Sequence, residues 1–439
     1  MQHLLIYTDN RSARLDYIFN FILSDILGVL FSITNDKDSF LAYNGPKFSY
    51  TSAPLADELF LSAHPFLFEQ TIKPQPIDFV EYNNIKGFFP VFNNYSAIPF
   101  DIFASAFFMV VRYEEYLPGK KDKYDRYRGS QSMNHKAGFL EKPMIDLYAL
   151  ELKKSLLQRF PEMEFGARKF TYKATFDIDM AYSYKHKGFK RNFGGFLRGF
   201  IMSDYKELRE RFAVLTRGVK DPFDTYDYIF EVCNIHNIPT CFFFLLGDES
   251  RFDKNIEFDN EAYRQLIKDI NDKAETGIHL SFKSHISNRQ TDMEIKRLAD
   301  ITGQKVERNR YHYLRFQIPS SYTRLVQAGI TKDYSMGYAG RVGFRAGTCT
   351  PHQFFNLKTN MVTDLQIIPF AFMDTTFTHY YRTENSKSLE KIRELMKSVK
   401  EVEGPLVALW HNSSFTEQQQ WRGWREIFET VARESTHLT

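Results

Sequence analysis

The sequence predicts an α/β protein whose C-terminal part alternates strands and helices. After residue 166, short apolar runs alternate with stretches of helical periodicity, a pattern that favours a parallel sheet or a barrel. Reactive side chains directly follow several of these runs, as expected where a site forms at the ends of barrel strands. The 439 residues suffice for two domains. We predict a smaller mixed α/β domain over residues 1–165 and a barrel over residues 166–439.

Composition indicates a globular protein and argues against several functional classes. The chain is 43% hydrophobic and 25% charged, which is usual for a folded domain. A net charge of +3 gives no general basis for binding nucleic acid. Its three cysteines show no CxxC spacing, so neither a zinc knuckle nor a disulfide framework is indicated. We therefore expect no nucleic-acid partner.

The N-terminal segments give no sign of targeting to or across a membrane. The first residues lack a basic region and a small-residue cleavage site. The apolar segment 17–33 is interrupted by Asp25 and is short for a membrane span. We interpret it as a buried helix that leads into a strand, and we expect a cytoplasmic protein without an integral membrane segment.

The N-terminal block is predicted to contain a strand at residues 4–7 and a helix over residues 102–116. Asp101 precedes that helix and can cap it. The charged residues 112–115 at its end are interpreted as a surface ion pair. The charged segment 120–128 that follows is interpreted as a solvated loop.

The C-terminal block contains six predicted strands. They cover residues 172–176, 240–245, 277–280, 313–318, 365–370 and 406–410, with helices between them, for instance at 261–272 and 292–301. A basic segment over residues 184–198 interrupts the alternation. It fits two interpretations equally well: a lid that meets an anionic polymer or a lipid-linked substrate, or a solvated insertion.

Two carboxylates mark the end of the first of these strands. Asp177 and Asp179 are two residues apart, so their side chains leave a strand on the same side. Neighbouring carboxylates repel each other, and a cation or a shared proton relieves the repulsion. Alone, the pair also fits a solvated strand end. Other reactive residues stand at or near later strand ends: His279, Arg310, His312 and His411.

In their order, these motifs resemble those of the polysaccharide deacetylases of carbohydrate esterase family 4. Residues 175–179, Thr-Phe-Asp-Ile-Asp, resemble the aspartate motif of that family. The histidine, arginine and leucine-x-histidine motifs correspond to residues 277–281, 310–312 and 408–412. Residues 98–101, 112–116 and 343–348 resemble a branch with an extra N-terminal domain. The resemblance implies a distorted (β/α) barrel of the polysaccharide deacetylase type.

The chain departs from the family at the second histidine of the histidine motif, where Lys283 stands. The resemblance implies that Asp179 and His279 bind a divalent metal, which leaves one ligand position open. Candidates for it are His312, His285, Ser284 and water. We favour His312 because it lies at a neighbouring strand end. Carboxylate and imidazole suit zinc, and also cobalt or nickel. The departure also leaves open a site without any metal.

The resemblance also implies catalytic roles. Asp177 would be the general base that takes a proton from a water activated by the metal, and Arg310 would pair with it. His411 would be the general acid that protonates the leaving group. Residues assigned to substrate binding or orientation are Arg345, Trp410 and Asp374. The histidines without motif partners, His64, His236 and His379, are interpreted as structural.

Three functional hypotheses follow. The first is a metal-dependent hydrolase that removes acetyl groups from an N- or O-acetylated sugar or polysaccharide precursor. The second is a catalytically inactive relative that binds glycans after losing the metal site. The third is a metal-free glycoside hydrolase, which ranks last because no partner glutamate stands at a strand end. The expected partner is an acetylated carbohydrate.

Overall fold

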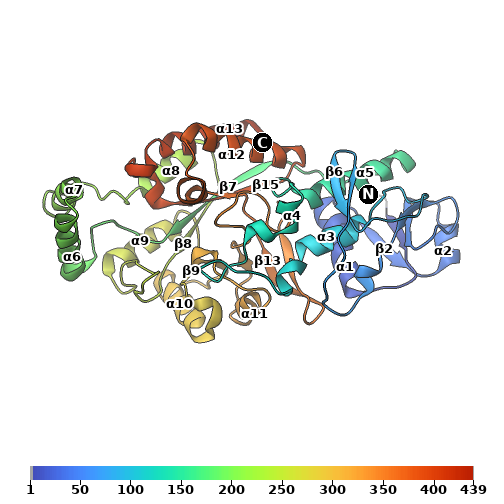
Figure 1. The fold of residues 1–439 in the computed structure, drawn as a ribbon, viewed down its shortest axis with the longest axis horizontal. Coiled ribbons are helices and arrows are strands. Elements are labelled where there is room, and N and C mark those ends of the chain that lie inside the picture. The colour runs from blue at the N-terminus through green and yellow to red at the C-terminus, as the bar shows by residue number, and fades with distance from the viewer. Residues whose placement is uncertain (1–2, 439) are drawn as a thin grey trace.

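The computed structural model describes residues 3–438 as a mixed α/β protein (Figure 1). A four-stranded and a two-stranded sheet lie in the N-terminal part, and a nine-stranded sheet dominates the rest of the described chain. None of the described helices is long and apolar enough to cross a membrane.

The N-terminal part, blue to cyan in Figure 1, is built on a small parallel sheet. Its strands lie in the order β2 (Phe31–Thr34), β1 (Leu4–Tyr7), β3 (Lys47–Thr51) and β4 (Leu59–Ser62). The strand expected at residues 4–7 is therefore confirmed. The other main elements are α1 (Ala13–Phe19), a π-helix (Asn20–Ile26), α2 (Lys37–Ala42), β5 (Phe79–Tyr82), β6 (Ile85–Phe88), α3 (Ile102–Val110), α4 (Met133–Lys136) and α5 (Met144–Arg159).

The helix that follows Asp101 is shorter than predicted. The Asp101 carboxylate accepts hydrogen bonds from the backbone N–H groups of Phe103 and Ala104, which confirms the cap. The α-helix ends at Val110, and Arg112 adopts a left-handed conformation with φ of 56°. The prediction of a surface ion pair was wrong, because Arg112 is 1% exposed and pairs with two glutamates in the interior.

The large sheet is mainly parallel. Its strands lie in the order β12 (His352–Asn356), β13 (Met361–Ile367), β11 (Lys332–Asp333), β10 (Arg308–Tyr311), β9 (Glu275–Leu280), β8 (Thr240–Phe244), β7 (Thr171–Ile178), β15 (Pro405–His411) and β14 (Phe372–Met373). Among the described strands of this sheet, only β12 and β13 pair in an antiparallel manner. The helices are α6 (Gly188–Ile201), α7 (Tyr205–Thr216), α8 (Tyr226–Ile235), α9 (Glu261–Asn271), α10 (Asn288–Thr302), α11 (Ser320–Gln327), α12 (Asn385–Glu401) and α13 (Trp424–Leu438).

One predicted strand was misplaced. Residues 313–318 alternate apolar and polar side chains, but Tyr313 has a φ of 60° and the segment leaves the sheet. The strand of this region is β10, whose Arg-Asn-Arg-Tyr sequence looks exposed. It is nevertheless buried, because Asn309 donates a hydrogen bond to Asp333 and Arg310 contacts Asp177.

The large sheet is strongly curved. Three strand spacings separate β10 from β7, about 14 Å in a flat sheet. An arginine side chain cannot bridge that distance, yet Arg310 Nη1 lies 2.8 Å from Asp177 Oδ1. Curvature also encloses a second apolar cluster, to which Phe243, Phe370 and Leu409 contribute from separate strands and loops. The described strand pairings run from β12 to β14 without joining these two ends.

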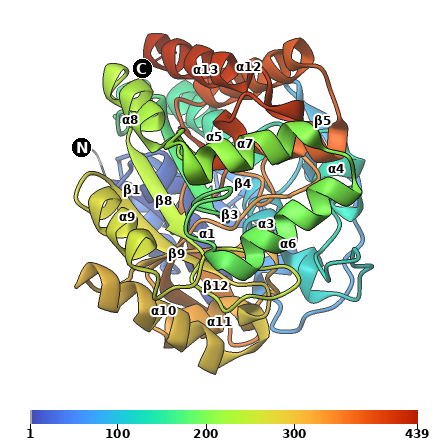
Figure 2. The ribbon, with the colours of Figure 1, turned by 90° about the vertical axis from the view of Figure 1, so that its left-hand side faces the viewer.

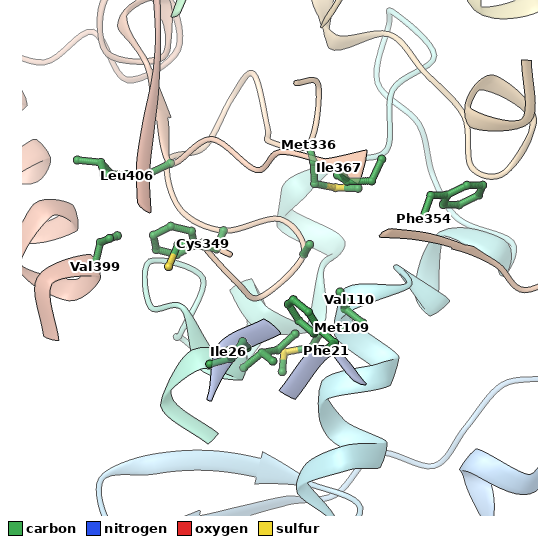
Figure 3. Packing of buried hydrophobic residues seen from close by; sticks show 14 of the residues in the cluster. Phe21, Ile26, Met109, Val110, Met336, Cys349, Phe354, Ile367, Val399 and Leu406 are labelled. Carbon is green, nitrogen blue, oxygen red and sulfur yellow. The ribbon is translucent and has the colours of Figure 1, made fainter. Parts of the chain in front are cut away.

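The N-terminal part and the large sheet share one apolar core. Tyr17 of α1 and Phe107 of α3 pack against Phe355 of β12, with ring centroids 5.1 and 5.3 Å apart. The N-terminal part therefore covers the edge strand of the large sheet, which would otherwise be open to pairing. Figure 3 shows other residues of this core. Phe21, Ile26, Met109 and Val110 come from the N-terminal part, and Met336, Phe354 and Ile367 come from the C-terminal part.

Two helices project from the end of the molecule opposite the N-terminal sheet. They are α6 and α7, which form a hairpin at the left of Figure 1 and lie in front of the sheet in Figure 2. In the same view of Figure 1, α12 and α13 lie above the large sheet, and α10 and α11 lie below it.

Candidate metal centre

The two aspartates of the Asp-Ile-Asp segment lie at the end of β7, an inner strand of the large sheet. The apolar residues before them are buried, so the strand is fixed on both faces. Asp177 is 3% exposed and accepts a hydrogen bond of 2.8 Å from Arg310. Asp179 follows the last residue of the strand, and its side chain is less enclosed. Both carboxylates approach one imidazole, that of His279.

His279 is on β9 and is 1% exposed. Its Nδ1–H donates to the backbone carbonyl of Arg310 at 3.0 Å, and this bond fixes the ring orientation. Its Nε2 atom lies 3.1 Å from Asp179 Oδ1 and 3.7 Å from Asp177 Oδ2. The nitrogen that could bind a metal therefore faces both carboxylates.

His312 reaches the same place from the end of β10. Its Nε2 atom lies 3.5 Å from Asp179 Oδ2. Its Nδ1–H donates to Asp253 Oδ1 at 2.8 Å. Asp253 is itself held by the backbone N–H of Phe282 and the hydroxyl of Ser250. A carboxylate behind a histidine is the usual partner that orients an imidazole toward a metal.

Asp179, His279 and His312 form a cluster that could hold a metal ion. Their ligand atoms all lie within 4.8 Å of one another. Asp179 Oδ1 is buried and has no hydrogen-bond partner. An unpartnered buried carboxylate oxygen is costly, and a cation would satisfy it. One carboxylate with two imidazoles is also a donor set that suits zinc. These residues therefore fit a divalent metal.

The charges of the cluster also fit a cation. Burial opposes ionisation of Asp179, but the charge of His312 and the close His279 and His312 side chains outweigh it, so the Asp179 pKa lies well below its usual value. Burial also opposes the charged form of His312 and so lowers its pKa, but Asp179 and Asp253 raise this pKa to about 10. The cluster thus favours one positive charge beside Asp179, which a bound metal would supply in place of a proton.

The alternative third ligands lie elsewhere. Ser284 donates its hydroxyl hydrogen to Glu294 at 2.9 Å. His285 donates Nδ1–H to the carbonyl of Phe282, and its Nε2 faces Asp125 at 4.0 Å. Neither belongs to the cluster, and Lys283 is exposed.

His411 completes the group of reactive side chains at this edge of the sheet. It ends β15, and its Nε2 atom lies 3.8 Å from Asp179 Oδ2. Its Nδ1–H donates to Asp374 Oδ1 at 2.7 Å, and its backbone N–H donates to Asp374 Oδ2. Burial lowers the His411 pKa, but the Asp374 charge and hydrogen bond raise it to about 9. This shift favours the imidazolium form of His411 at neutral pH.

Three residues assigned to substrate contact occupy other positions. Trp410 is fully buried, and its indole N–H donates to Tyr172 within the core. Arg345 is 2% exposed and pairs with Glu115, so it connects the two parts of the chain. Asp374 is also fully buried and orients His411. Substrate contact by Trp410 and Arg345 is therefore corrected to structural roles, whereas orientation of a reactive group by Asp374 agrees with its hydrogen bonds from His411.

The reactive side chains lie in a cavity of about 580 Å³. Part of its wall comes from the segment interpreted above as a solvated loop, namely Lys123, Tyr124 and Arg126. Arg126 is 7% exposed and donates to the carbonyl of Tyr313 and the hydroxyl of Tyr380. The segment is a loop, as expected, and its Lys120, Lys121, Lys123 and Arg128 are exposed. It is not fully solvated, because the buried Arg126 holds it against the C-terminal part.

Several residues of the cavity were not expected from the sequence. They are Met180, Phe223, Tyr313, His379, Tyr380 and Trp421, together with the three from the N-terminal part and with Asp253 behind His312. His379, interpreted as structural, lines the cavity, and its ring lies 5.8 Å from that of Trp421. Asp253 follows strand β8 in the chain, so its position after a strand was a usable signal. Met180 directly follows Asp179, so it could also have been expected. Tyr313, His379, Tyr380 and Trp421 lie in short helical turns, and the others lie in loops, with no sequence pattern that predicts their position.

Comparisons with known proteins give distant matches. A model described as a family of unknown function, DUF7033, matches residues 4–161. No curated protein matches the chain. Among solved structures, the chain is similar to a protein assigned as a polysaccharide deacetylase from Mycobacterium smegmatis, with 12% identity, 62% of this chain and 91% of that chain covered, and a TM-score of 0.39. It is also similar to a CE4 family pseudoenzyme from Bacillus anthracis, with 13% identity, 61% of each chain covered, and a TM-score of 0.30.

Proposed function

We propose that this protein is a metal-dependent hydrolase that removes acetyl groups from an N- or O-acetylated sugar or polysaccharide precursor. The observation that carries the proposal is the cluster of Asp179, His279 and His312, which shares a cavity with Asp177 and His411. Metal-assisted hydrolysis of an amide or ester uses a bound cation, a base and an acid in one place, and this cavity contains residues suited to each role.

In this proposal the cluster holds zinc, or cobalt or nickel. A bound divalent metal would lower the pKa of a water molecule and polarise the substrate carbonyl. Asp253 acts as a positioning residue, because it fixes the His312 ring with Nε2 toward Asp179. The carbonyl of Arg310 does the same for His279.

Asp177 would be the general base. Its Oδ1 atom is occupied by Arg310, while Oδ2 faces the cluster. Arg310 is itself fixed by the carbonyl of Tyr334 and the hydroxyl of Thr175. Because Arg310 holds one carboxylate oxygen of Asp177, the other oxygen is the one available to accept a proton.

His411 would be the general acid. Its raised pKa favours the imidazolium form at neutral pH, and it stands at the cavity wall with Nε2 toward Asp179. Asp374 holds the opposite nitrogen, so the Nε2 proton is the one that His411 can give to a departing amine or alcohol.

The cavity wall fits a carbohydrate. Tyr124, Tyr313 and Trp421 line it, and aromatic rings are suitable surfaces for the apolar face of a sugar. We propose that residues 1–165 form an accessory domain that supplies part of this wall and that residues 166–439 form a distorted barrel of the polysaccharide deacetylase type. Tyr124 and its neighbours would then contribute to substrate choice.

A second candidate function is glycan binding without turnover. Lys283 in place of the usual second histidine favours it. The arrangement of an acid, a base and the partners that orient them favours the hydrolase, because a binding protein gains nothing from an oriented proton donor.

Metal content and hydrolysis of a chromogenic acetyl ester test the proposal together. We expect one zinc, cobalt or nickel ion per chain, and activity that a chelator abolishes and the metal restores. His312→Ala should lose both metal and activity. His285→Ala is the matched control, since this buried histidine lies outside the cluster. Absence of metal after incubation with excess divalent ions, or full activity of His312→Ala, would contradict the hydrolase.

A further inference from the structure

The α6–α7 hairpin presents an apolar face that no other part of the described chain covers. Phe189, Phe193, Leu197 and Phe200 lie three or four residues apart on α6, so they form one stripe along the helix. These side chains are between 54% and 82% exposed. Nearly half of the large apolar side chains exposed in residues 3–438 fall between Phe189 and Val219. Exposed apolar surface of this extent marks an interaction site.

The same segment is strongly basic. Residues 184–220 contain ten lysines and arginines but only three acidic residues, against a net charge of +3 for the whole chain. Lys190, Arg198, Lys206 and Arg209 are exposed. Arg211, in contrast, is turned inward and pairs with Glu207. The hairpin therefore combines an aromatic face with a surrounding excess of positive charge.

The hairpin is anchored firmly at its base. Asp221, 2% exposed, accepts hydrogen bonds from the backbone N–H groups of Ser183, Tyr184 and Lys185 at 2.7 to 3.0 Å. Arg191 donates to two backbone carbonyls of the loop at residues 254–255. The apolar face is thus held outward by a structured base.

This base lies beside the candidate metal centre. Met180 precedes the hairpin and Phe223 follows it, and both line the cavity. Glu210 of α7 accepts a hydrogen bond from Gln418, which lies close in sequence to the cavity residue Trp421. Whatever binds the hairpin therefore lies close to the mouth of the cavity.

We propose that the α6–α7 hairpin docks the protein on the anionic surface of a phospholipid membrane. Helix α6 has 14 residues, too few to span a bilayer, which needs about 20. An amphipathic helix with aromatic residues on one face and cations beside them lies in the plane of the interface instead. The cations would contact lipid phosphates, each adding to the attraction. A second copy of the chain fits less well, because two basic hairpins repel each other.

Sedimentation with vesicles tests this proposal on the full chain. We expect binding to vesicles of phosphatidylcholine with phosphatidylglycerol, and weaker binding to pure phosphatidylcholine or at high salt. Replacing Phe189, Phe193 and Phe200 together by serine should lower partitioning by about tenfold or more per ring. Lys190→Gln with Arg198→Gln should lower it about fivefold per charge, on anionic vesicles only. Phe92→Ser, at a 92% exposed position of the N-terminal part, is the control that retains binding.

A Phe193→Trp variant gives a second readout that does not depend on loss of function. Its fluorescence should shift to shorter wavelength with anionic vesicles and be quenched by brominated lipid. The proposal is overturned if wild type binds neither vesicle, or if the triple serine variant, shown to be folded by circular dichroism, binds as wild type does. A dimer that the triple variant dissociates, without vesicle binding, would overturn it in favour of self-association. Vesicle binding does not depend on the proposed hydrolase, which acetyl ester hydrolysis tests separately.

Discussion

The Nδ1 atom of His312 lies 2.8 Å from Oδ1 of Asp253, and this contact sets the direction of the imidazole. The other nitrogen, Nε2, consequently faces Asp179 at 3.5 Å. His312 stands in a tight 3-10 turn directly after β10, so the ring would otherwise have several rotamers available. Asp253 comes from the loop after another strand, which makes the orientation of His312 a product of tertiary structure.

Asp253→Asn should weaken metal binding without unfolding the protein. The amide cannot hold the His312 ring with the same charge, and loss of such a partner typically lowers metal affinity about 10- to 100-fold. Competition with a chromogenic chelator measures the affinity. Asp248→Asn is the control, because Asp248 is in the same loop but pairs with Arg297 at the surface. Equal affinity in both variants would show that Asp253 has no positioning role.

Asp374→Asn should reduce kcat about 100-fold or more and change its dependence on pH. Asp374 raises the His411 pKa to about 9, so wild type should lose its general acid only as the pH rises through this value. Without the carboxylate charge, the pKa of His411 falls and the decline in kcat moves to lower pH. The measurement is the pH profile of acetyl ester hydrolysis.

Ser414→Ala provides the control for Asp374. It removes one hydrogen bond to Asp374 but keeps the carboxylate charge beside His411. Its alkaline limb should coincide with that of wild type. If the Asp374→Asn variant has a lower kcat at every pH but the same apparent pKa as wild type, the role of this aspartate is purely structural.

Trp410→Ala should destabilise the protein by about 3 to 5 kcal/mol, the usual cost of removing a fully buried tryptophan. Its ring packs between Phe372 and Phe428, with centroids 5.5 and 5.1 Å away. Trp410→Phe should cost less and leave KM unchanged, because the side chain does not reach the cavity. Urea unfolding and substrate kinetics check the two statements. If a stable Trp410→Phe variant has a raised KM, Trp410 does contact the substrate and its assignment as purely structural is wrong.

Asp101 should make stability depend on pH. Burial raises its pKa from 3.8 to about 6, against hydrogen bonds from Ala104, Tyr50, His64 and Phe103 that lower it. The folded state therefore favours the protonated acid, and this stabilisation is complete below pH 3.8 and is lost as the pH rises through 6. The change amounts to about 3 kcal/mol.

The Asp101→Asn variant isolates this effect, because asparagine can still cap α3 but does not titrate in this range. As the pH rises from 4 to 7.5, the free energy of unfolding of wild type should fall relative to that of the variant. A difference that is constant over this range would mean that Asp101 keeps an ordinary pKa in the folded protein.

Much of the sheet and part of the site could be predicted from the sequence. Apolar runs such as residues 240–245 correspond to inner parallel strands, which are buried on both faces and are therefore continuous in hydrophobicity. Reactive residues placed directly after such runs, among them Asp179 and His411, come together because the carboxyl ends of parallel strands share one edge of the sheet.

The rest depends on contacts that no local pattern reveals. The strand β10 is polar in sequence, and it is buried only because Asn309 and Arg310 find partners on other strands. The apolar residues after it, starting at Tyr313, imitate a strand by their alternation. The sequence of the charged segment 120–128 does not reveal that it lines the cavity. Its Arg126 pairs with the nearby Asp122, but it also donates to Tyr313 and Tyr380, which are far away in the sequence.

That segment has a consequence for how the chain can be divided. A fragment that begins at residue 166 would retain all six reactive side chains, yet it would lack the wall formed by Lys123, Tyr124 and Arg126 and would leave β12 uncovered. In any assay, such a fragment would have an uncovered edge strand, which favours aggregation, and a wider cavity than the full chain. Changes of substrate preference in relatives of this protein should therefore be sought in both parts of the chain at once, since one surface is shared between them.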